Sequence, residues 1–570
     1  MSTSSTDWGS KKAPAKNRGT RSKSARNTPE VTVATEPDLP EKVWRIGVIA
    51  IFLIAAVLRL YDLNLVPLHH DEGVNGNFLV RLVREGAYNY DPANYHGPTL
   101  YYFSAIIPWI TKLLFGNTAR DNYGLTTFTI RLVPVVFGLA TIGLIFLLRR
   151  RLGSIAALAA GLLLAISPGA VYLSRYFIHE TLFVFFTVGI VVAFMRFYDE
   201  TNAAYLIPVA ASAALLFATK ETAMISAGVL FIALVSTQAY LWLLRATGVS
   251  STPKRSKGQK GLSAKLEQIG GGPGFYSNPR LGFTVFVLPF AVFVALYCLF
   301  YTSFFTNNKG LTDSLQTFAI WAKTGSEAHT HPPTTYFLWL MSQESPLLFI
   351  GALGAAITVL RPKNSFALFC GLWSFGLIAA YSLIAYKTPW LMLNFIVPLA
   401  LVSGYAIQAM YEMLNNLTGT ALVSLGLPGM ILVAAIGVNG YQTIDLNFVN
   451  YDNDKQYYVY VYAHTTRSTL ALVNEIDRLA KENSGNSTGI TIVSPDYWPL
   501  PWYFRNYTRV GYYGRMAVAS EPLIIANANQ KDEVDANYGQ FYQMVNGPDP
   551  GGTFQLRPGV DLLLYQRRKQ

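Results

Sequence analysis

Long uncharged apolar segments are the feature that most limits how this chain can fold. A helix that crosses the hydrocarbon core of a bilayer needs about 20 apolar residues, and about eleven segments come close to that length. Only 14% of the 570 residues are charged, against about 25% in an average soluble protein. The sequence therefore predicts an α-helical polytopic membrane protein with about eleven spans. These segments lie at residues 45–63, 129–148, 154–173, 180–197, 203–219, 222–244, 282–301, 345–360, 365–384, 391–411 and 420–441.

Clusters of Lys and Arg separate alternate apolar segments. They comprise the tail that ends at Arg45, the triplet Arg149–Arg151, the loop 254–265, and Arg361 with Lys363. Cytoplasmic loops of membrane proteins carry an excess of Lys and Arg. The clusters therefore predict a multi-pass plasma-membrane protein with a cytoplasmic N-terminus. The net charge of +12 then reflects membrane topology, and no nucleic-acid partner is expected.

One further apolar segment, residues 99–115, is not counted as a span. It contains Pro108 and Lys112. Counting it would place the Arg149–Arg151 triplet on the opposite side from the other basic clusters. We therefore expect a re-entrant or interfacial helix here, and this choice places everything after residue 441 outside the cell.

The chain is expected to have three parts. They are a disordered, basic cytoplasmic tail (1–43), a transmembrane domain (44–441) with a large first outer loop (64–128), and a small extracytoplasmic α/β domain (442–570). In the last part, apolar spacing predicts a helix over 467–482 and short buried strands at 489–494, 522–526 and 561–565. Residues 496–514 are dense in aromatic side chains. These stack on sugar rings, rest on the lipid headgroups, or form the core of the small domain.

The first outer loop contains the motif His69-His70-Asp71-Glu72. Apolar residues follow it at helical spacing, which predicts an amphipathic helix lying flat in the membrane interface. A carboxylate there can serve as a general base if it reaches the proton to be removed. Adjacent helical residues point about 100° apart, so Asp71 is favoured and Glu72 is the second candidate. The alternative is that Asp71 caps the helix and Glu72 is a first-turn charge.

The other outer loops add cations, histidines and an aromatic residue at the ends of spans. The cations Arg175, Lys220 and Lys387 suit a membrane-bound phosphate. The alternatives are a turn stabilised by an ion pair, a lysine that snorkels to the headgroups, and interfacial anchors. The histidines are compatible with a divalent cation, but their spacing matches no known ligand pattern and no metal ligand is assigned. The candidate substrate-binding or lipid-phosphate-binding residues are His70, His96, Arg175, His179, Glu180, Lys220, Glu221, His331, Lys387 and Trp390.

Several motifs together resemble a known class of enzyme. They are HHDEGVNG, YDPANYHGPTLYYF, SRYFIHET, ATKET, YKTPWLMLNF and DYWPLPWYFRNY. Over about residues 44–515 the chain resembles the GT-C fold membrane glycosyltransferases, and within them the protein O-mannosyltransferase and aminoarabinose-transferase-like branch. More narrowly, it resembles the flippase-activity-associated glycosylation proteins of haloarchaea. The two histidines of HHDE depart from the simpler Asp-Glu loop of the class.

The resemblance implies a transferase that uses a polyprenyl-phosphate-linked sugar at the outer face. The acceptor would be a glycan or a protein. Asp71 would act as the base, and Arg175, Lys220 or Lys387 would hold the lipid phosphate. The alternative is a flippase, or a flippase-associated protein, for lipid-linked sugars. A transporter places ionisable groups near the bilayer midplane, whereas the ionisable groups of this chain lie near span ends. A non-catalytic scaffold would leave these clusters unexplained.

Overall fold

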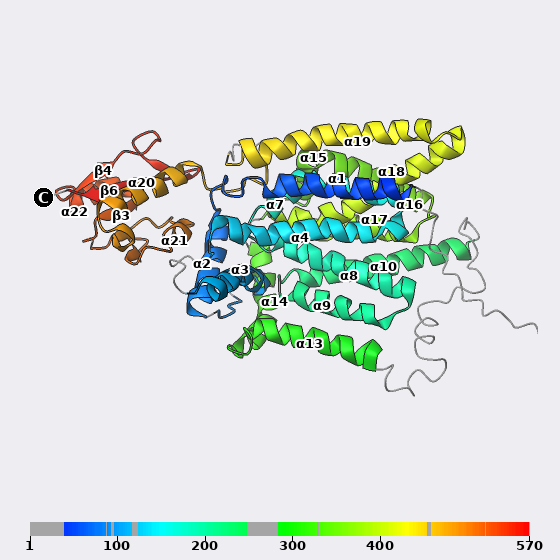
Figure 1. Cartoon of the computed structure of the whole chain (residues 1–570), viewed down its shortest axis with the longest axis horizontal. Helices are drawn as coiled ribbons and strands as arrows, with labels where there is room; N and C mark the ends of the chain where they lie inside the picture. The colour runs from blue at the N-terminus through cyan, green and yellow to red at the C-terminus, as the bar shows by residue number, and fades with distance from the viewer. Residues whose placement is uncertain are drawn as a thin grey trace, which may run out of the picture.

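The computed structural model describes residues 39–86, 88–92, 96–116, 124–247, 283–327, 330–452, 458–518 and 520–568. A bundle of long helices carries a small α/β domain at one end, which we call the domain-facing end (Figure 1). The predicted tail over 1–43 lies almost wholly outside the described residues, and so does the loop 254–265.

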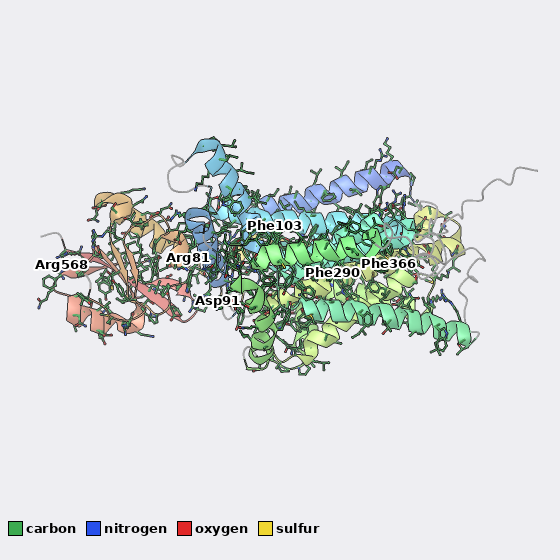
Figure 2. All side chains as sticks on the ribbon, turned by 90° about the horizontal axis from the view of Figure 1, so that it is seen from below. Arg81, Asp91, Phe103, Phe290, Phe366 and Arg568 are labelled. Carbon is green, nitrogen blue, oxygen red and sulfur yellow. The ribbon has the colours of Figure 1, made fainter. Side chains whose placement is uncertain are left out.

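Within the described residues, eight helices are long and apolar enough to cross a membrane. They are α1 (Glu41–Leu60), α4 (Thr127–Leu147), α8 (Glu180–Glu200), α10 (Ala223–Ala246), α13 (Leu288–Tyr301) with η3 (Phe283–Val287), α17 (Ser365–Leu383), α18 (Leu393–Thr418) with η4 (Pro389–Met392), and α19 (Ala421–Ile444) with η5 (Asp445–Val449). Figure 2 shows Phe103, Phe290 and Phe366 along this bundle, whereas Arg81 and Asp91 lie towards its domain-facing end.

Helices also occupy the other predicted spans, but less regularly. The segment 154–173 forms α6 (Ser154–Ala165) and α7 (Pro168–Ser174), bent by 62°. In the same way α15 (Thr335–Gln343) and α16 (Ser345–Leu360) meet at 113°. The segment 203–219 holds η1 (Ala203–Tyr205) and α9 (Leu206–Phe217), and α9 has only 12 residues, fewer than a complete span needs. The arginine triplet forms α5 (Arg149–Leu152).

Polar side chains inside the bundle form hydrogen bonds with the backbone groups that the break between α6 and α7 leaves unpaired. Pro168 begins α7 and has no N–H to donate to α6. Arg59 donates to two carbonyls at the end of α6, at 3.1 and 2.9 Å, and Thr443 donates to the next carbonyl at 2.7 Å. Glu344 accepts an amide hydrogen at the start of α7 at 2.9 Å. Unsatisfied backbone groups are costly in a bilayer, so these contacts allow the helix to bend.

The first outer loop forms two helices at the domain-facing end. α2 (His70–Glu85) lies across the ends of the long helices, between the bundle and the C-terminal domain (Figure 1). α3 (Thr99–Phe115) packs against α2 and ends in exposed apolar side chains, with Leu113 83% exposed. α3 is not among the helices long enough to span, as the sequence predicted for residues 99–115. α14 (Lys309–Glu327) follows α13 in the chain.

The C-terminal domain is a mixed sheet flanked by helices. The strand order is β2-β1-β3-β6-β4, with β5 also paired to β6. β1 pairs in parallel with β2 and β3, and β6 is antiparallel to its neighbours. The predicted helix over 467–482 is confirmed as α20, and the three predicted strands are β1, β3 and β6. The elements are α20 (Ser468–Glu482), η6 (Gly485–Ser487), β1 (Ile490–Ile492), α21 (Leu500–Tyr503), β2 (Val510–Tyr512), β3 (Leu523–Asn527), η7 (Ala528–Gln530), α22 (Lys531–Tyr538), β4 (Tyr542–Val545), β5 (Phe554–Arg557) and β6 (Val560–Arg567).

Two glycines of α2 allow the C-terminal domain to dock closely. A Cβ atom on Gly73 would lie 2.4 Å from the Cβ of Pro499, and one on Gly76 would lie 2.6 Å from a ring carbon of Trp502. The two glycines are three residues apart and so share one helix face. Trp502 is 1% exposed and donates a hydrogen bond to Thr127 at 3.2 Å. The glycines therefore fix how the domain sits on α2.

A Gly76→Val variant is expected to loosen this docking, because the added side chain overlaps the Trp502 ring. We expect a loss of about 1–3 kcal/mol of stability, seen as a lower Tm and faster release of the C-terminal domain by trypsin. Gly228→Val is the matched control, since that helical glycine has open space around it. Equal effects of the two substitutions would contradict the docking role of Gly76.

Candidate active site

Segments far apart in the sequence meet beneath α2. The Gly97 amide donates to the Thr219 carbonyl at 3.1 Å, which joins the first outer loop to the turn between α9 and α10. Asn75 of α2 donates to the Phe177 carbonyl at 3.1 Å and accepts from the Tyr101 hydroxyl at 2.9 Å. These contacts bring together the predicted motifs around residues 69–75, 96–101, 175–180 and 219–221.

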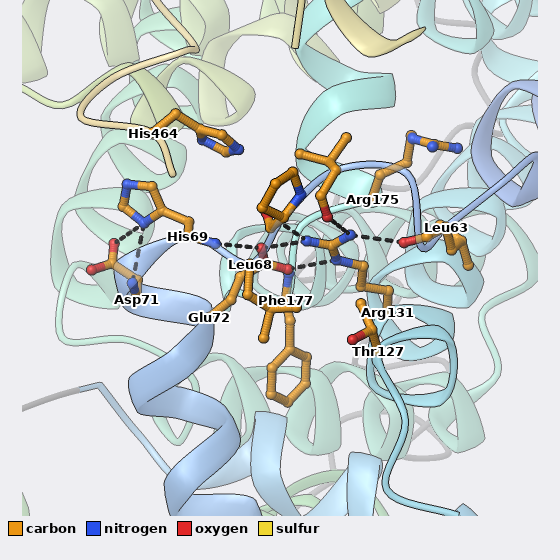
Figure 3. Close-up of polar contacts among 12 residues, drawn as sticks. Leu63, Leu68, His69, Asp71, Glu72, Thr127, Arg131, Arg175, Phe177 and His464 are labelled. Carbon is orange, nitrogen blue, oxygen red and sulfur yellow. Dashed lines mark hydrogen bonds and ion pairs between the residues drawn. The ribbon is translucent and has the colours of Figure 1, made fainter. Parts of the chain in front are cut away.

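Asp71 is an accessible carboxylate in the first turn of α2. The N-cap of α2 is His69, whose Nδ1 accepts the Asp71 amide hydrogen at 3.1 Å. The alternative interpretation of Asp71 as the cap is therefore wrong. The Asp71 side chain is 33% exposed, and its Oδ2 lies 3.8 Å from His69 Nδ1, the nitrogen that accepts the Asp71 amide hydrogen (Figure 3). The carboxylate is thus held in place by the helix and remains open to a substrate.

Glu72, the second predicted catalytic residue, has no exposed surface. Its Oε1 accepts from Arg131 Nε and from the Phe177 amide, both at 2.8 Å. Its Oε2 accepts from an Arg131 Nη at 2.6 Å and from the His69 amide at 3.0 Å (Figure 3). Both oxygens are therefore engaged, so the geometry of Glu72 suits positioning the start of α2 and not proton transfer.

Arg131 is a residue that the sequence reasoning missed. It lies near the start of α4, is 2% exposed, and also donates to the carbonyls of Leu63 and Val66, at 2.7 and 2.8 Å. One guanidinium thus joins α4, the chain before α2, and Glu72. An ionisable residue inside an apolar segment was the available signal, because such residues are costly in a membrane.

A buried ion pair and a contact between a histidine and a carboxylate lie at the turn between α9 and α10. Lys220 Nζ is 2.5 Å from Glu180 Oε1, and Glu221 Oε2 is 2.8 Å from His96 Nδ1. Burial acts to lower the pKa of Lys220, but the carboxylates of Glu180 and Glu221 outweigh it and raise that pKa. Lys220 is therefore a buried, permanently charged ammonium. His179 completes the cluster, with its Nε2 3.0 Å from the Gly97 carbonyl and its ring 5.2 Å from that of His96.

The charges of this cluster and that of Asp71 both act on Tyr386. Burial raises the pKa of its hydroxyl, and the charges of Lys220, Asp71 and Glu221 also act on it. Tyr386 therefore lies within electrostatic reach of both the buried cluster and the accessible carboxylate. Tyr386 belongs to the AYKTPW motif, in which the sequence indicated the neighbouring Lys387 and Trp390 as candidates.

Arg175 and Lys387 face backbone carbonyls. Arg175 donates to the carbonyls of Tyr61 and Asp62, at 2.6 and 2.9 Å, and so closes the end of α1. Lys387 is 1% exposed and donates to the carbonyls of Ile384 and Ser382 at the C-terminal end of α17, at 2.5 and 3.1 Å. The structure thus brings Lys220 next to the carboxylates, while Arg175 and Lys387 stabilise helix ends.

The candidates His331 and Trp390 lie close to Tyr386, His331 in the fold and Trp390 in the sequence. The His331 amide donates to the Ala385 carbonyl at 3.1 Å, next to the bridge between Thr330 and Tyr386. The Trp390 ring packs edge-on against Tyr462, at 6.3 Å between centroids. Both belong to the surroundings of the cluster.

His464 is a buried histidine in the chain that leads to the C-terminal domain. It is 2% exposed, its Nδ1 is 3.0 Å from the Tyr172 hydroxyl, and its ring is 5.4 Å from that of His69. Within the described residues its Nε2 has no hydrogen-bond partner. Burial lowers the pKa of His464 well below the usual value, and His69 and Arg131 lower it further. The ring is therefore neutral in the folded protein.

This buried ring predicts a loss of stability in acid. An unfolded histidine gains a proton near pH 6.5, whereas His464 has a lowered pKa and stays neutral when folded. Its destabilising effect is absent above about pH 6.5 and grows as the pH falls below that value. His179, whose pKa burial also lowers, adds to it. We expect Tm to fall between pH 7 and 5, and to fall less in His464→Phe. His331→Phe, at a half-buried histidine, is the control and should keep the wild-type dependence of Tm on pH. The same dependence in His464→Phe as in the wild type would contradict this role of His464.

The part of the chain that the structure describes contains no group of three or more His, Cys, Asp or Glu side chains that could hold a metal ion. The divalent cation considered from the sequence therefore has no ligand set among these residues.

Comparison with known proteins identifies the fold. The family model described as dolichyl-phosphate-mannose-protein mannosyltransferase matches residues 104–249. The structure is similar to ArnT from Cupriavidus metallidurans bound to undecaprenyl phosphate, with 12% identity, a TM-score of 0.59, and coverage of 92% of this chain and 98% of ArnT. The apo form of ArnT gives 13% identity, a TM-score of 0.58 and the same coverage. No curated protein sequence matches the chain significantly.

A weaker similarity is to the apo oligosaccharyltransferase of Archaeoglobus fulgidus, with 15% identity, a TM-score of 0.49, and coverage of 83% of this chain and 64% of that one. The two ArnT structures are sufficient for the fold. This chain has the GT-C fold of membrane glycosyltransferases.

Proposed function

We propose that this protein transfers a sugar from a polyprenyl-phosphate donor to an acceptor hydroxyl at the outer face of the membrane. The observation that carries the proposal is the accessible carboxylate of Asp71 in the first turn of α2, whose charge acts on the Tyr386 hydroxyl together with that of the buried ammonium of Lys220. The similarity to ArnT bound to undecaprenyl phosphate supports the donor class. The basic residues support the orientation: Arg149 pairs with Glu41 at the end of α1 remote from α2, where the sequence predicts cytoplasm.

In the proposed reaction Asp71 removes the proton from the acceptor hydroxyl. The hydroxyl oxygen forms a bond to the anomeric carbon of the sugar while the bond from that carbon to the phosphate oxygen breaks. The electron pair leaves with the polyprenyl phosphate. A positioned general base contributes typically about 10²–10⁴-fold to such a step.

Lys220 would stabilise the negative charge that develops on the leaving phosphate. Its ammonium is 4% exposed and already placed by Glu180. A donor placed in advance and shielded from water stabilises a transition state by about 3–4 kcal/mol. Glu180, Glu221 and His96 would hold Lys220 charged and in position.

A flippase is the rival function, and broken helices are a feature of transporter sites. In this protein, however, Arg59, Thr443 and Glu344 satisfy the break between α6 and α7. The cavity beside Arg59 measures about 10 Å³, which is about the space of one water molecule. The break therefore offers no room for a sugar, and the ionisable cluster lies at the domain-facing end.

The test uses the full-length protein in nanodiscs with a labelled polyprenyl-phosphate sugar. We expect release of polyprenyl phosphate and appearance of the label on an added glycan or peptide acceptor. In parallel, proteoliposomes report whether the lipid-linked sugar crosses the bilayer. Crossing without cleavage of the sugar–phosphate bond would overturn the proposal in favour of the flippase.

A further inference from the structure

We propose that the acceptor is a glycan, and that Tyr497 and Trp498 of the C-terminal domain form the surface on which one of its sugar rings stacks. This inference rests on the proposed function. It concerns the second substrate of the reaction and assigns its recognition to the loop after β1, which we call the acceptor loop (residues 494–499).

The structure divides the aromatic stretch 496–514 into two groups. Trp502 and Phe504, each 1% exposed, belong to the buried interior, and Arg505 stacks on Trp502 at 4.2 Å. Tyr497 and Trp498 remain partly exposed. The first group thus forms the core that the sequence allowed for, and the second is available to a ligand.

The acceptor loop lies over the start of α2. The ring of Trp498 is 6.1 Å from that of His70, the neighbour of Asp71. Pro499 packs on Gly73. The loop follows β1, the central strand of three parallel strands. Ligands of α/β sheets bind beyond the carboxyl ends of such strands, and here that end faces the candidate active site.

The aromatic rings form a continuous shelf. Tyr497 lies 5.8 Å from Trp498 and 5.3 Å from Tyr512 of β2, measured between ring centroids. Such rings offer a broad apolar face with little conformational freedom to lose. The C–H face of a pyranose ring is apolar and matches it.

Polar groups suited to sugar hydroxyls surround this shelf. Asp496 and Arg557 form an ion pair at partial exposure, with side chains 37% and 23% exposed. Their charges, and that of Asp71, act on His70, whose pKa burial lowers. A neutral imidazole both donates and accepts hydrogen bonds. In the ion pair, the guanidinium donates hydrogen bonds and the neighbouring carboxylate accepts them. An aromatic face with such a polar rim fits the apolar faces and hydroxyl edges of a glycan.

A peptide acceptor fits these observations less well. Extended peptides gain affinity by adding a strand to a free sheet edge. The edge strand nearest the acceptor loop, β2, has three residues, which gives few backbone hydrogen bonds. The first turn of α2 thus has the aromatic shelf on the C-terminal domain side, at His70, while the ion pair of Lys220 lies in the bundle. Donor and acceptor would meet at Asp71 from these two sides.

The experiment measures binding of neutral oligosaccharides to the full-length protein in nanodiscs, without donor, by isothermal titration calorimetry. We expect Trp498→Ala to weaken binding by roughly tenfold or more, because the stacked face is lost. Phe541→Ala is the matched control, because Phe541 is an aromatic residue of the same domain that is 53% exposed in the turn before β4. This variant should bind oligosaccharides like the wild type. Unchanged affinity in Trp498→Ala, or binding of unglycosylated peptides in place of oligosaccharides, would overturn the inference.

A second variant keeps the inference testable if Trp498→Ala does not fold. Trp498→Phe keeps an aromatic ring, so oligosaccharides should still bind, but the change in tryptophan fluorescence seen with wild type should largely disappear. An equal fluorescence change in both proteins would place the sugar elsewhere. Because donor is absent, the outcome is separate from that of the transfer assay. Suppose that Trp498→Ala loses glycan binding but the wild type does not cleave the donor. This pair of results would contradict the proposed function and leave the glycan-binding inference standing.

Discussion

Replacing Asp71 by asparagine is expected to lower kcat for sugar transfer by about 10²–10⁴-fold. Asparagine keeps the size and most hydrogen bonds of the side chain but cannot take the proton of the acceptor hydroxyl. Because the Asp71 side chain is 33% exposed and does not cap α2, the substitution should leave Tm nearly unchanged. The assay is the rate of polyprenyl phosphate release at saturating donor and acceptor, measured with the Tm of the same sample.

Asp62→Asn is the matched control for this loss. Asp62 lies between α1 and α2, is exposed, and has a φ of 41°, a left-handed conformation that asparagine tolerates. The control makes the same chemical change at the same end of the bundle and should keep full activity. Turnover by Asp71→Asn at the wild-type rate would eliminate Asp71 as the base.

Replacing Glu72 by glutamine should instead destabilise the fold. The change leaves the Arg131 guanidinium, 2% exposed, without its partner carboxylate. Breaking a buried ion pair in this way costs about 3–5 kcal/mol. We expect a large drop in Tm in detergent, and activity should fall with the amount of folded protein. The contrast with Asp71→Asn, one residue away, separates a positioning carboxylate from a reacting one.

A double variant tests the origin of that cost. Removing both charges, in Glu72→Gln with Arg131→Gln, should destabilise less than the sum of the single changes, because neither charge is left buried alone. A Glu72→Gln protein with the Tm of the wild type and a strongly reduced kcat would show that Glu72 acts on the substrate, contrary to its buried geometry.

The sequence predicted helices well and side-chain directions poorly. Arg175, Lys220 and Lys387 looked equivalent, because each follows or joins apolar segments at the same end of the bundle. In the structure Arg175 and Lys387 donate to carbonyls at helix ends, whereas Lys220 pairs with Glu180 from another helix. Spacing along the chain gives the depth of a residue in the membrane, but not which neighbour its side chain meets.

Glu72, Arg131 and Tyr386 illustrate the same limit. The adjacent carboxylates of Asp71 and Glu72 differ in environment because one is partly exposed and the other faces Arg131, 59 residues further along the chain. Nothing in the local pattern marks that partner.

The sequence by itself determined the polytopic bundle, the short apolar helix over 99–115, the α/β domain and the position of the first-loop carboxylates in the chain, because these depend on the length, spacing and charge of local segments. Only the tertiary structure decided that His69 caps α2, that Glu72 is tied to Arg131, and that Trp498 lies against His70. These outcomes depend on contacts between distant segments. Two glycines of α2 allow the close approach of the C-terminal domain, and no local pattern encodes that packing.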